Sequence, residues 1–277
     1  MADPALIKSV NDVSAQEIKS ISELQASLSQ SSGLERYGAH DWLKLAWSRS
    51  LDSTKAMDVV KTHQEFIQRF NLADIPLDQI RENFKAGFSV LAGRDFDGRP
   101  MLWQRMQFMN PSTIPLSVGI KSTWLALDAA LADLESNRVG VCLIYDFTNV
   151  GMRNISLNLF DVRDGSLACG TGHPSHITRV IFLNAPFVFR MGFNAAKPLL
   201  PTSVTSVIQM VDTSSNADEE GRNWYDNLCP RTQLPEYLGG EQKGDYFKWL
   251  THRLEGSNLL YHPETIKSEP ESEAIAQ

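Results

Sequence analysis

Residues 139–147, VGVCLIYDF, decide the fold because they form an almost unbroken apolar run between polar residues. A run of this length without polar alternation predicts a strand that is buried on both faces. Such strands occur in mostly parallel sheets whose strands are connected by helices. Residues 101–106, 180–183 and 207–211 predict three further strands. The section from about residue 86 to 250 is therefore predicted to be an α/β sheet domain.

Helical patterns fill the gaps between the predicted strands. Pro115 opens a predicted long helix that carries Ile120, Trp124, Leu127, Leu131 and Leu134. Two more helices are predicted over residues 155–167 and 187–197. Ahead of the strand at 101–106, residues 93–100, GRDFDGRP, have the turn-forming composition of a hairpin connection.

The first 85 residues have a different, all-helical character. Ser14 and Glu17 have the spacing of a capping box, ahead of Ile18, Ile21, Leu24 and Leu28 at helical spacing. Further helices are predicted over residues 40–49, from an N-cap at Ser53 with Met57, Val60 and Phe66 or Ile67 on one side, and from Pro76. Residues 263–277 are rich in glutamate and lack aromatic residues, which predicts disorder. We therefore expect a helical domain at 1–85, the sheet domain at 86–255 and an acidic tail at 256–277.

The composition excludes several classes of protein. The 277 residues carry a net charge of −7, whereas nucleic acids and anionic membranes bind basic surfaces. We therefore expect no nucleic-acid partner and no stable electrostatic adsorption to membranes. The three cysteines lack zinc spacing, which predicts neither a disulfide framework nor a metal site. The N-terminal residues show no apolar signal core and no apolar run approaches 18 residues, so we expect a cytoplasmic protein.

Motifs for catalysis are weak or missing. The sequence contains no Gly-x-Ser-x-Gly elbow and no phosphate-binding Gly-x-x-x-x-Gly-Lys loop. Residues 170–172, GTG, lack a preceding strand, and His173 and His176 lack a third partner for a metal ion. Asp146 ends the apolar strand, where it either caps the next turn or serves an enzyme as an acid. No base or nucleophile accompanies Asp146, so we expect no catalysis, no metal and no cofactor.

Four phenylalanines crowd one short segment of the chain. They are Phe182, Phe187, Phe189 and Phe193, and Pro186 and Gly192 interrupt the segment. Packing in the core explains these rings. Large apolar side chains at helical spacing, between hinge residues, also suit a mobile lid over an apolar cavity. Composition alone favours the core and leaves the lid open as an alternative.

Several short motifs follow one another in a specific order. They are SRSLD at 48–52, KA at 55–56, GRDFDGRP at 93–100, YDF at 145–147, FLNAP at 182–186, KPLL at 197–200 and LPEYLGG at 234–240. Over about residues 35–250, this order resembles the CRAL-TRIO lipid-binding family. That family includes the retinaldehyde-binding proteins, the α-tocopherol transfer proteins and the yeast phosphatidylinositol transfer proteins.

The resemblance implies a small N-terminal helical domain and a mostly parallel sheet with helices on its outer face. A lid helix covers a hydrophobic cavity that holds one hydrophobic molecule. Alternate residues of the central strand would face this cavity, with Cys142 and Ile144 against the outer helices. The positions assigned to ligand binding by the resemblance are Ile120, Thr123, Trp124, Leu127, Val141, Leu143, Tyr145, Met152, Val180, Phe182, Phe187, Phe189, Phe193 and Ala196. Among them, Thr123 and Tyr145 are the candidate polar handles.

The chain departs from the family where relatives bind phosphate groups. Ser175, His176 and Val207 stand where phosphatidylinositol-transferring relatives have a Glu-Arg pair and a Lys, and Gly151 and Arg153 stand where those relatives meet the headgroup. The phosphoinositide-binding basic cluster of the tocopherol-transfer relatives corresponds to His176, Thr178, Ser203 and Val207. A desolvated phosphate needs fixed donors, and these positions are mostly uncharged. Phosphatidylinositol cargo and phosphoinositide-triggered release are therefore both in doubt.

The resemblance predicts a non-catalytic carrier that moves one hydrophobic molecule through the cytosol between membranes. The cargo would be a lipid, retinoid, carotenoid, tocopherol-like compound or phospholipid, and the carrier would contact membranes transiently. Two other classes stay open. The acidic tail favours an interaction or membrane-recruitment module that senses lipid or docks a protein partner. An α/β enzyme that uses Asp146 is the third interpretation.

Overall fold

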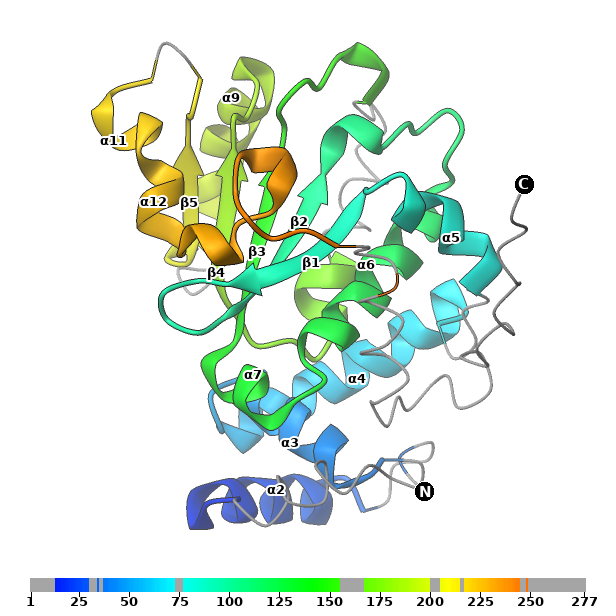
Figure 1. Ribbon diagram of the computed structural model, residues 1–277. Coiled ribbons are helices and arrows are strands. Elements are labelled where there is room, and N and C mark those ends of the chain that lie inside the picture. The colour runs from blue at the N-terminus through cyan, green and yellow to red at the C-terminus, as the bar shows by residue number, and fades with distance from the viewer. Residues whose placement is uncertain are drawn as a thin grey trace, which may run out of the picture.

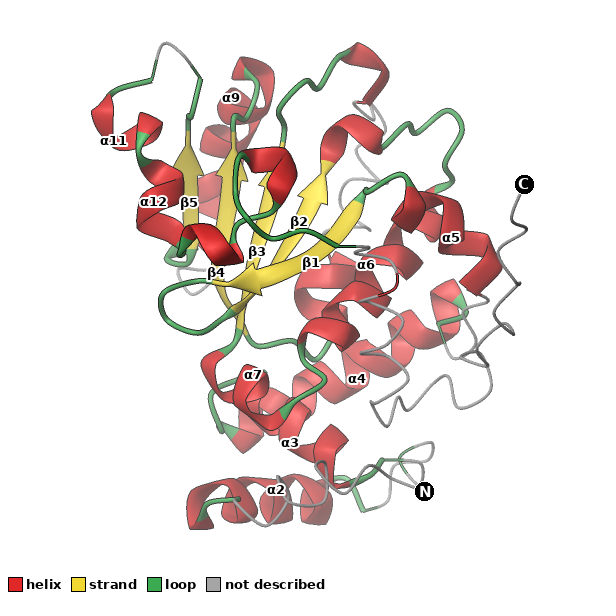
Figure 2. Cartoon of the chain, in the orientation of Figure 1, coloured by secondary structure: helices red, strands yellow, loops and turns green. Residues whose placement is uncertain are grey.

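The computed structural model describes residues 13–29, 34, 37–72, 77–154, 167–199, 205–214, 217–244 and 248. Its centre is a five-stranded sheet with the strand order β1-β2-β3-β4-β5 (Figure 1). The strands are β1 (Ser89–Arg94), β2 (Pro100–Arg105), β3 (Val141–Asp146), β4 (Ile177–Leu183) and β5 (Ile208–Val211). β1 pairs antiparallel with β2, and each later pair is parallel. Helices lie on both sides of the sheet (Figure 2), so the predicted α/β fold class is confirmed.

The four predicted strands lie where the sequence predicts them, within a few residues at each end, whereas β1 was not predicted as a strand. The apolar pattern marks β4 only from Val180, because Thr178 and Arg179 precede that run within the strand. The predicted hairpin connection joins β1 to β2. In it, Asp95 Oδ1 accepts the main-chain N–H groups of Asp97 and Arg99, at 3.0 and 2.9 Å. Gly98 completes the turn at a φ of 82°, which glycine adopts without strain.

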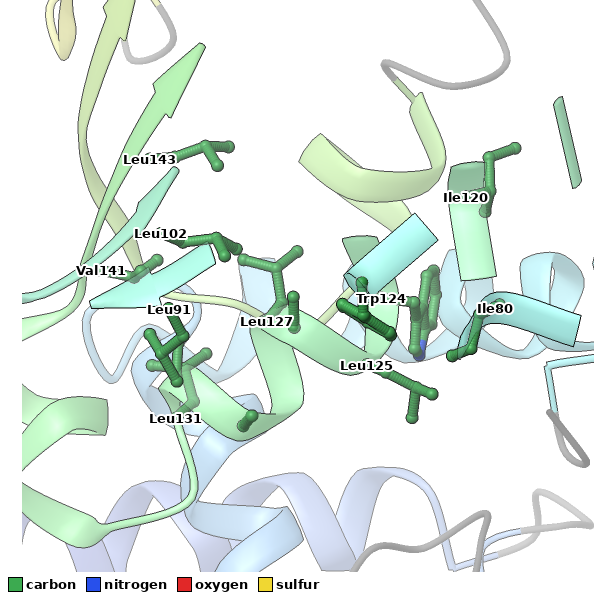
Figure 3. Packing of buried hydrophobic residues seen from close by; sticks show 14 of the residues in the cluster. Ile80, Leu91, Leu102, Ile120, Trp124, Leu125, Leu127, Leu131, Val141 and Leu143 are labelled. Atoms are coloured by element: carbon green, nitrogen blue, oxygen red, sulfur yellow. The ribbon is translucent and has the colours of Figure 1, made fainter. Parts of the chain in front are cut away.

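Alternate residues of β3 point to opposite faces of the sheet, as predicted. Val141 and Leu143 pack in one cluster with Leu127 of α6 (Leu116–Ala130), which Figure 3 shows from close by. Cys142 and Ile144 pack in a second cluster on the other face. That cluster includes buried side chains of α12 (Trp224–Leu228), which follows α11 (Glu219–Arg222). The sheet is therefore covered on both faces around its central strand.

The long helix predicted after Pro115 is wrong in its C-terminal part. α6 ends at Ala130, and α7 (Leu134–Val139) begins after an interruption. Asp133 is the N-cap of α7, where its Oδ1 accepts the Ser136 N–H at 2.7 Å. Leu131 and Leu134 continue the apolar spacing across this break. The spacing alone therefore does not reveal where α6 ends.

The N-terminal section is helical, as predicted, with α2 (Ala15–Ser27), α3 (Ala39–Trp47), α4 (Ser53–Phe70) and α5 (Leu77–Lys85). The capping box of α2 is confirmed, since Glu17 N–H donates to Ser14 Oγ and Ser14 N–H donates to Glu17 Oε2. Of the four apolar residues at helical spacing, Ile18 has a side chain that is 55% exposed. Glu17 is buried beside it and accepts Arg138 Nε at 2.8 Å.

Two details of the helical section correct or extend the sequence analysis. The N-cap of α4 is Asp52 and not Ser53, because Asp52 Oδ1 accepts the Lys55 N–H at 3.1 Å. Phe66 of α4 and Phe84 of α5 belong to the same buried cluster as Leu125 of α6. The apolar core is thus continuous across residue 85. The division into domains at 1–85, 86–255 and 256–277 stays a prediction.

The start of the motif at 93–100 meets Gln233, the residue directly ahead of the motif at 234–240. A Cβ on Gly93, whose φ is 69°, would lie 2.0 Å from the carbonyl oxygen of Gln233. The Gln233 side chain in turn accepts the Arg94 N–H at 3.2 Å. A glycine at position 93 is therefore required for this close approach.

Some predictions fall on parts of the chain outside the described residues. These are residues 155–166 of a predicted helix and the tail at 256–277. Within the described ranges, no helix combines the length and the apolar character that a membrane-crossing segment needs.

Candidate functional site

The junction between β4 and α9 (Phe187–Ala196) is the turning point of the candidate site. β4 ends at Leu183, and Asn184 follows in the left-handed region at a φ of 54°. Asparagine tolerates this conformation better than most side chains. Pro186 then forms the N-cap of α9, as the predicted helix at 187–197 requires. The chain is thereby redirected from the sheet into α9 within three residues.

The Asn184 side chain joins the ends of three neighbouring strands. Its Nδ2 donates to Thr148 Oγ1, after β3, at 2.8 Å and to Thr213 Oγ1, after β5, at 3.0 Å. Its Oδ1 accepts the Thr213 N–H at 2.7 Å, and its own N–H donates to Val211 O at 2.8 Å. The sequence analysis gave Asn184 only as part of a junction motif. These bonds hold the carboxyl ends of β3, β4 and β5 in register.

Asp146 closes β3 at the same rim of the sheet. Its carboxylate is buried, and Oδ1 accepts the Thr148 N–H at 2.9 Å. This bond is the turn cap that the sequence analysis weighed against a catalytic role. The arrangement therefore supports a structural function for Asp146.

Five aromatic side chains gather between this rim and α9. They are Tyr145, Phe147, Phe182, Phe189 and Phe193, and we call them the aromatic cluster. The ring centroids of Phe189 lie 4.9 Å from Phe182 and 4.7 Å from Phe147. Phe193 lies 5.6 Å from Phe182, and Tyr145 lies 5.5 Å from it. All five side chains are only half-buried, so the cluster is not sealed within the core.

α9 also carries apolar side chains that face away from the protein. Phe187, Val188 and Met191 are 66%, 72% and 57% exposed. They stand within five residues, and we call them the outer face of α9. An exposed group of large apolar side chains on one helix marks a contact surface for another apolar phase or partner.

The structure divides the predicted ligand-binding residues into groups. Those on α6 and the first half of β3 are buried in the closed core, and they are Ile120, Thr123, Trp124, Leu127, Val141 and Leu143. The Thr123 hydroxyl donates to Gly119 O at 3.1 Å, within its own helix. It is therefore already engaged in the fold as described. A ligand contact at any of these positions stays a prediction.

The other predicted positions lie nearer to α9. Tyr145, Val180, Phe182, Phe189 and Phe193 are half-buried on the α6 side of the sheet or on α9, and Phe187 is exposed. The side chains of Met152 and Ala196 are outside the described part of the structure. Sequence analysis missed Phe147, although this residue belongs to the decisive apolar run. Its ring packs on both β4 and α9.

A second cluster of side chains is polar and lies deep under α6. Lys44 Nζ of α3 donates to Asp128 Oδ1 of α6 at 2.8 Å, and both side chains are less than a tenth exposed. His173 Nε2 approaches the same oxygen at 3.3 Å. We call these residues and His63 of α4 the polar node. The node joins α3, α4 and α6 to the segment ahead of β4.

Mutual electrostatics hold Lys44 and Asp128 in their charged forms. Burial alone opposes both charges. The Lys44 ammonium outweighs burial at Asp128 and holds the pKa of that carboxyl well below its usual range. In the same way, Asp128 raises the pKa of Lys44. The pair is therefore a charged, buried ion pair, and removing either partner leaves an uncompensated charge.

The histidines of the polar node are neutral and packed on Trp124. Burial and the neighbouring His173 lower the pKa of His63 to about 3, and burial also lowers the pKa of His173. The His63 ring stacks on Trp124 at 5.4 Å, and His173 meets the Trp124 edge-on at 4.9 Å. His63 Nδ1 lies 2.8 Å from Gly172 O, to which it donates. Trp124 is therefore enclosed by imidazole rings.

The two histidines of the His-x-x-His pattern have different partners. His173 faces Asp128, whereas His176 Nδ1 lies 3.0 Å from Asn137 O and its ring packs on Trp47. This separation favours the structural interpretation of a polar turn before a strand. Among the described residues, no three His, Cys, Asp or Glu side chains gather as metal ligands.

The mostly parallel sheet and the helices on both of its faces define an α/β domain. The family model of the CRAL/TRIO domain matches residues 84–240, more than half of the chain, and the chain belongs to this family. The match includes all five strands and α9. The family suggested by the sequence motifs is therefore confirmed.

Comparisons with individual proteins agree with this assignment. Over 214 residues, the chain is 24% identical to the tyrosine-protein phosphatase non-receptor type 9 of human and to that of mouse. The match covers 75% of this chain and 34% of each phosphatase, so the chain spans about a third of the length of these relatives. In a crystal structure, Sfh5 shares the fold with a TM-score of 0.53 at 12% identity. That likeness covers 85% of this chain and 91% of the Sfh5 chain.

The buried histidines of the polar node, together with His40, predict that the fold loses stability in acid. His40, His63 and His173 have pKa values below the usual 6.5, to about 4 for His40 and about 3 for His63. The unfolded chain takes up these protons below pH 6.5, whereas the folded chain does not. Burial raises the pKa of Asp41 to about 6, which opposes the trend between pH 6 and 4. We expect unfolding free energy to fall by about 2 kcal/mol per pH unit from pH 6 to 4.5, measured by urea denaturation.

The variant His63→Phe isolates one of these contributions. Phenylalanine keeps a ring against Trp124 but removes the titrating group and the bond to Gly172 O. At pH 7.5 we expect a loss of about 1 kcal/mol from the missing bond. Below pH 6 the unfolding free energy of the variant should fall less steeply than that of the parent, with a slope smaller by about 1 kcal/mol per pH unit. A slope equal to that of the parent would contradict the role assigned to His63.

Substitution of Asn184 should loosen the rim of the sheet. Asn184→Ala removes the side-chain bonds to Thr148 and Thr213 and places a less tolerant residue at positive φ. We expect a loss of about 3 kcal/mol in thermal or urea unfolding. Asn184→Gly removes the same bonds but relieves the backbone strain, so about 1 kcal/mol of that loss should return. Equal stability of the two variants would contradict the argument from backbone conformation.

Proposed function

We propose that the chain binds one hydrophobic small molecule between its sheet and α9 and carries it through the cytoplasm between membranes. Membership of the CRAL/TRIO family supports lipid binding itself. The aromatic cluster supports the position of the ligand between the sheet and α9. The outer face of α9 supports exchange of the ligand at a membrane. The cargo belongs to the lipids, retinoids, carotenoids, tocopherol-like compounds or phospholipids. In this proposal the protein catalyses no reaction and uses no cofactor, and the hydrophobic cargo is its ligand.

The observation that carries this proposal is the two-sided apolar character of α9. Phe189 and Phe193 join α9 to the rings of Phe147 and Phe182. Phe187 and Met191 point outward and are more than half exposed. Aromatic pairs contribute about 0.5–1.5 kcal/mol each beyond burial, and they are not directional like hydrogen bonds. α9 therefore opens at modest cost when its outer face enters an apolar phase.

The polar groups near the aromatic cluster favour a cargo with a small polar group. The Tyr145 phenol is the polar group of the aromatic cluster. His176, which stands at a phosphate-binding position of relatives, is engaged by Asn137 and Trp47. Arg153 is exposed in the turn at Met152–Asn154. These positions supply few fixed donors for a desolvated phosphate, so an uncharged lipid fits them better.

Ligand occupancy tests this proposal directly. Protein purified without detergent should yield about one extractable hydrophobic molecule per chain by mass spectrometry, and retinoids or carotenoids would show in its absorbance spectrum. Val180→Trp should lower that yield several-fold, because Val180 is half-buried beside Phe182 and tryptophan adds bulk there. Leu143 is less suitable, since it is packed in the closed core and extra bulk there strains the fold.

A matched variant controls for the added indole. Gln209→Trp places tryptophan on the exposed side of β5, away from α9, and should leave the yield unchanged. The proposal fails if the parent protein yields no lipid and takes up none from added vesicles. An unchanged yield in Val180→Trp would reject this part of the pocket.

The outer face of α9 should control contact with membranes. Phe187→Ser with Met191→Ser should reduce cosedimentation with neutral phosphatidylcholine vesicles several-fold, because about 25 cal/mol per Å² of apolar burial is lost. Ile18→Ser removes an equally exposed apolar side chain from α2 and serves as the control. A loss of the same size in both variants would show that α9 has no special part.

A second candidate function rests on the length of the relatives. The chain matches only a third of a tyrosine-protein phosphatase, so this type of domain also occurs as a module in a larger protein. In such a protein it would hold lipid to sense or dock rather than to carry. Transfer of a fluorescent lipid between vesicles separates the two functions. A carrier speeds the transfer in proportion to its concentration, whereas a docking module retains its lipid.

A further inference from the structure

Among the residues that the structure describes, β5 pairs with a strand on its β4 side alone. Val180 N–H donates to Val207 O, directly ahead of β5, and Asn184 N–H donates to Val211 O, so these two carbonyls point toward β4. Main-chain groups alternate in direction along a strand. The N–H and C=O groups of Ile208 and Met210 therefore point away from β4. In the described part of the chain, neither residue has a hydrogen-bond partner on that side.

A groove lies alongside this edge, and we call it the β5 groove. It has a volume of about 400 Å³ and is open to solvent. Residues 209–212 form one wall, and Ala217, Asp218, Gly221 and Trp224 form the other. α11 stands beside β5 in Figure 1, and α12 lies next to it across the sheet face that carries Ile144 and Ile181. The groove therefore runs between a free strand edge and a helical wall.

Charge in the β5 groove has one sign among its described lining residues. Asp212 and Asp218 are both exposed, and no lysine or arginine belongs to the described lining. Asp218 Oδ1 accepts the Gly221 N–H at 2.8 Å, which leaves its other oxygen to solvent. Arg190 of α9 lies close enough to affect Asp212 and contributes to its lowered pKa, after the hydrogen bonds from Ser214. Asp218 is therefore the sharper probe of the charge.

We propose that the β5 groove is a docking site for an extended segment of a partner protein that alternates basic and apolar residues. The segment adds a sixth strand and pairs with the free main-chain groups of Ile208 and Met210. Side chains of an added strand alternate between the two faces. One set meets the acidic wall at Asp218, which requires lysine or arginine. The other set lies on the face of the half-buried Ile208 and Met210 side chains, which favours apolar residues.

This inference is independent of the lipid proposal. The β5 groove lies toward Trp224, on the sheet face opposite the aromatic cluster. The added strand would lie beyond the outer edge of β5, whereas the aromatic cluster is built on β3, β4 and α9. The test likewise uses no lipid, so its failure and the failure of the carrier function are distinguishable.

Three synthetic peptides test the docking proposal on the full chain. The first is an acetylated and amidated Lys-Val-Lys-Val-Lys peptide, whose length spans the four residues of β5 at about 3.3 Å each. The second replaces each lysine by glutamate, and the third carries N-methyl groups on its backbone. Hydrogen exchange is followed by mass spectrometry over residues 205–214, and binding by fluorescence anisotropy. The lysine peptide should slow exchange in this segment, whereas the other two should bind at least tenfold more weakly.

Two matched variants locate the charge. Asp218→Asn keeps the capping bond to Gly221 and removes only the charge, so it should weaken binding about threefold, with less salt dependence. Asp226→Asn removes an exposed charge from α12 outside the described groove lining and should leave binding unchanged. Equal binding of the lysine and glutamate peptides, or slowed exchange only outside residues 205–214, would overturn the proposal. Absence of binding by all three peptides would overturn it as well.

Discussion

Burial of β3 on both faces is the constraint on which the rest of the structure depends. An unbroken apolar strand is stable only if neighbouring strands satisfy its main chain and helices cover both of its faces. β2 and β4 run parallel to β3, so the ends of β3 and β4 reach the same rim of the sheet. α6 covers one face and α12 the other. Asp146 and Asn184 stand at this rim because the parallel strands end there.

Much of this fold is predictable from the sequence because its signals are local. The apolar runs mark the strands, GRDFDGRP marks the hairpin, and Ser14 with Glu17 marks the start of α2. The missed features depend on residues distant in the chain. Lys44 is buried because it meets Asp128, and Glu17 because it meets Arg138. Composition places such charges on the surface, and only the assembled fold supplies the partners that make burial tolerable.

The candidate site is likewise predictable from the sequence only in part. Local patterns predict which face of the sheet its residues occupy, but not how closely they pack. The family resemblance and the period of two assign the α6 side of the sheet, and Val141, Leu143 and Tyr145 do share that face. Neither signal tells how closely α6 approaches the sheet. Leu127 belongs to the same buried cluster as Val141 and Leu143, so this half of the face is closed core (Figure 3). The half of this face nearer α9 carries the half-buried rings. α9 starts at the carboxyl ends of the strands and does not cover the part of the sheet on which α6 packs.

The α6 side and the α9 side of the proposed ligand site are held by different forces, and this difference suits the proposed carrier function. α6 is fixed by the polar node, where displacement would separate the buried Lys44 from Asp128. α9 is held by ring contacts, which tolerate sliding and exchange of partners. A bound hydrophobic molecule offers the same kind of contact to Phe189 and Phe193 as Phe182 does. Replacing one apolar partner of α9 by another therefore changes the free energy of the folded protein little. α6 stays in place during this exchange.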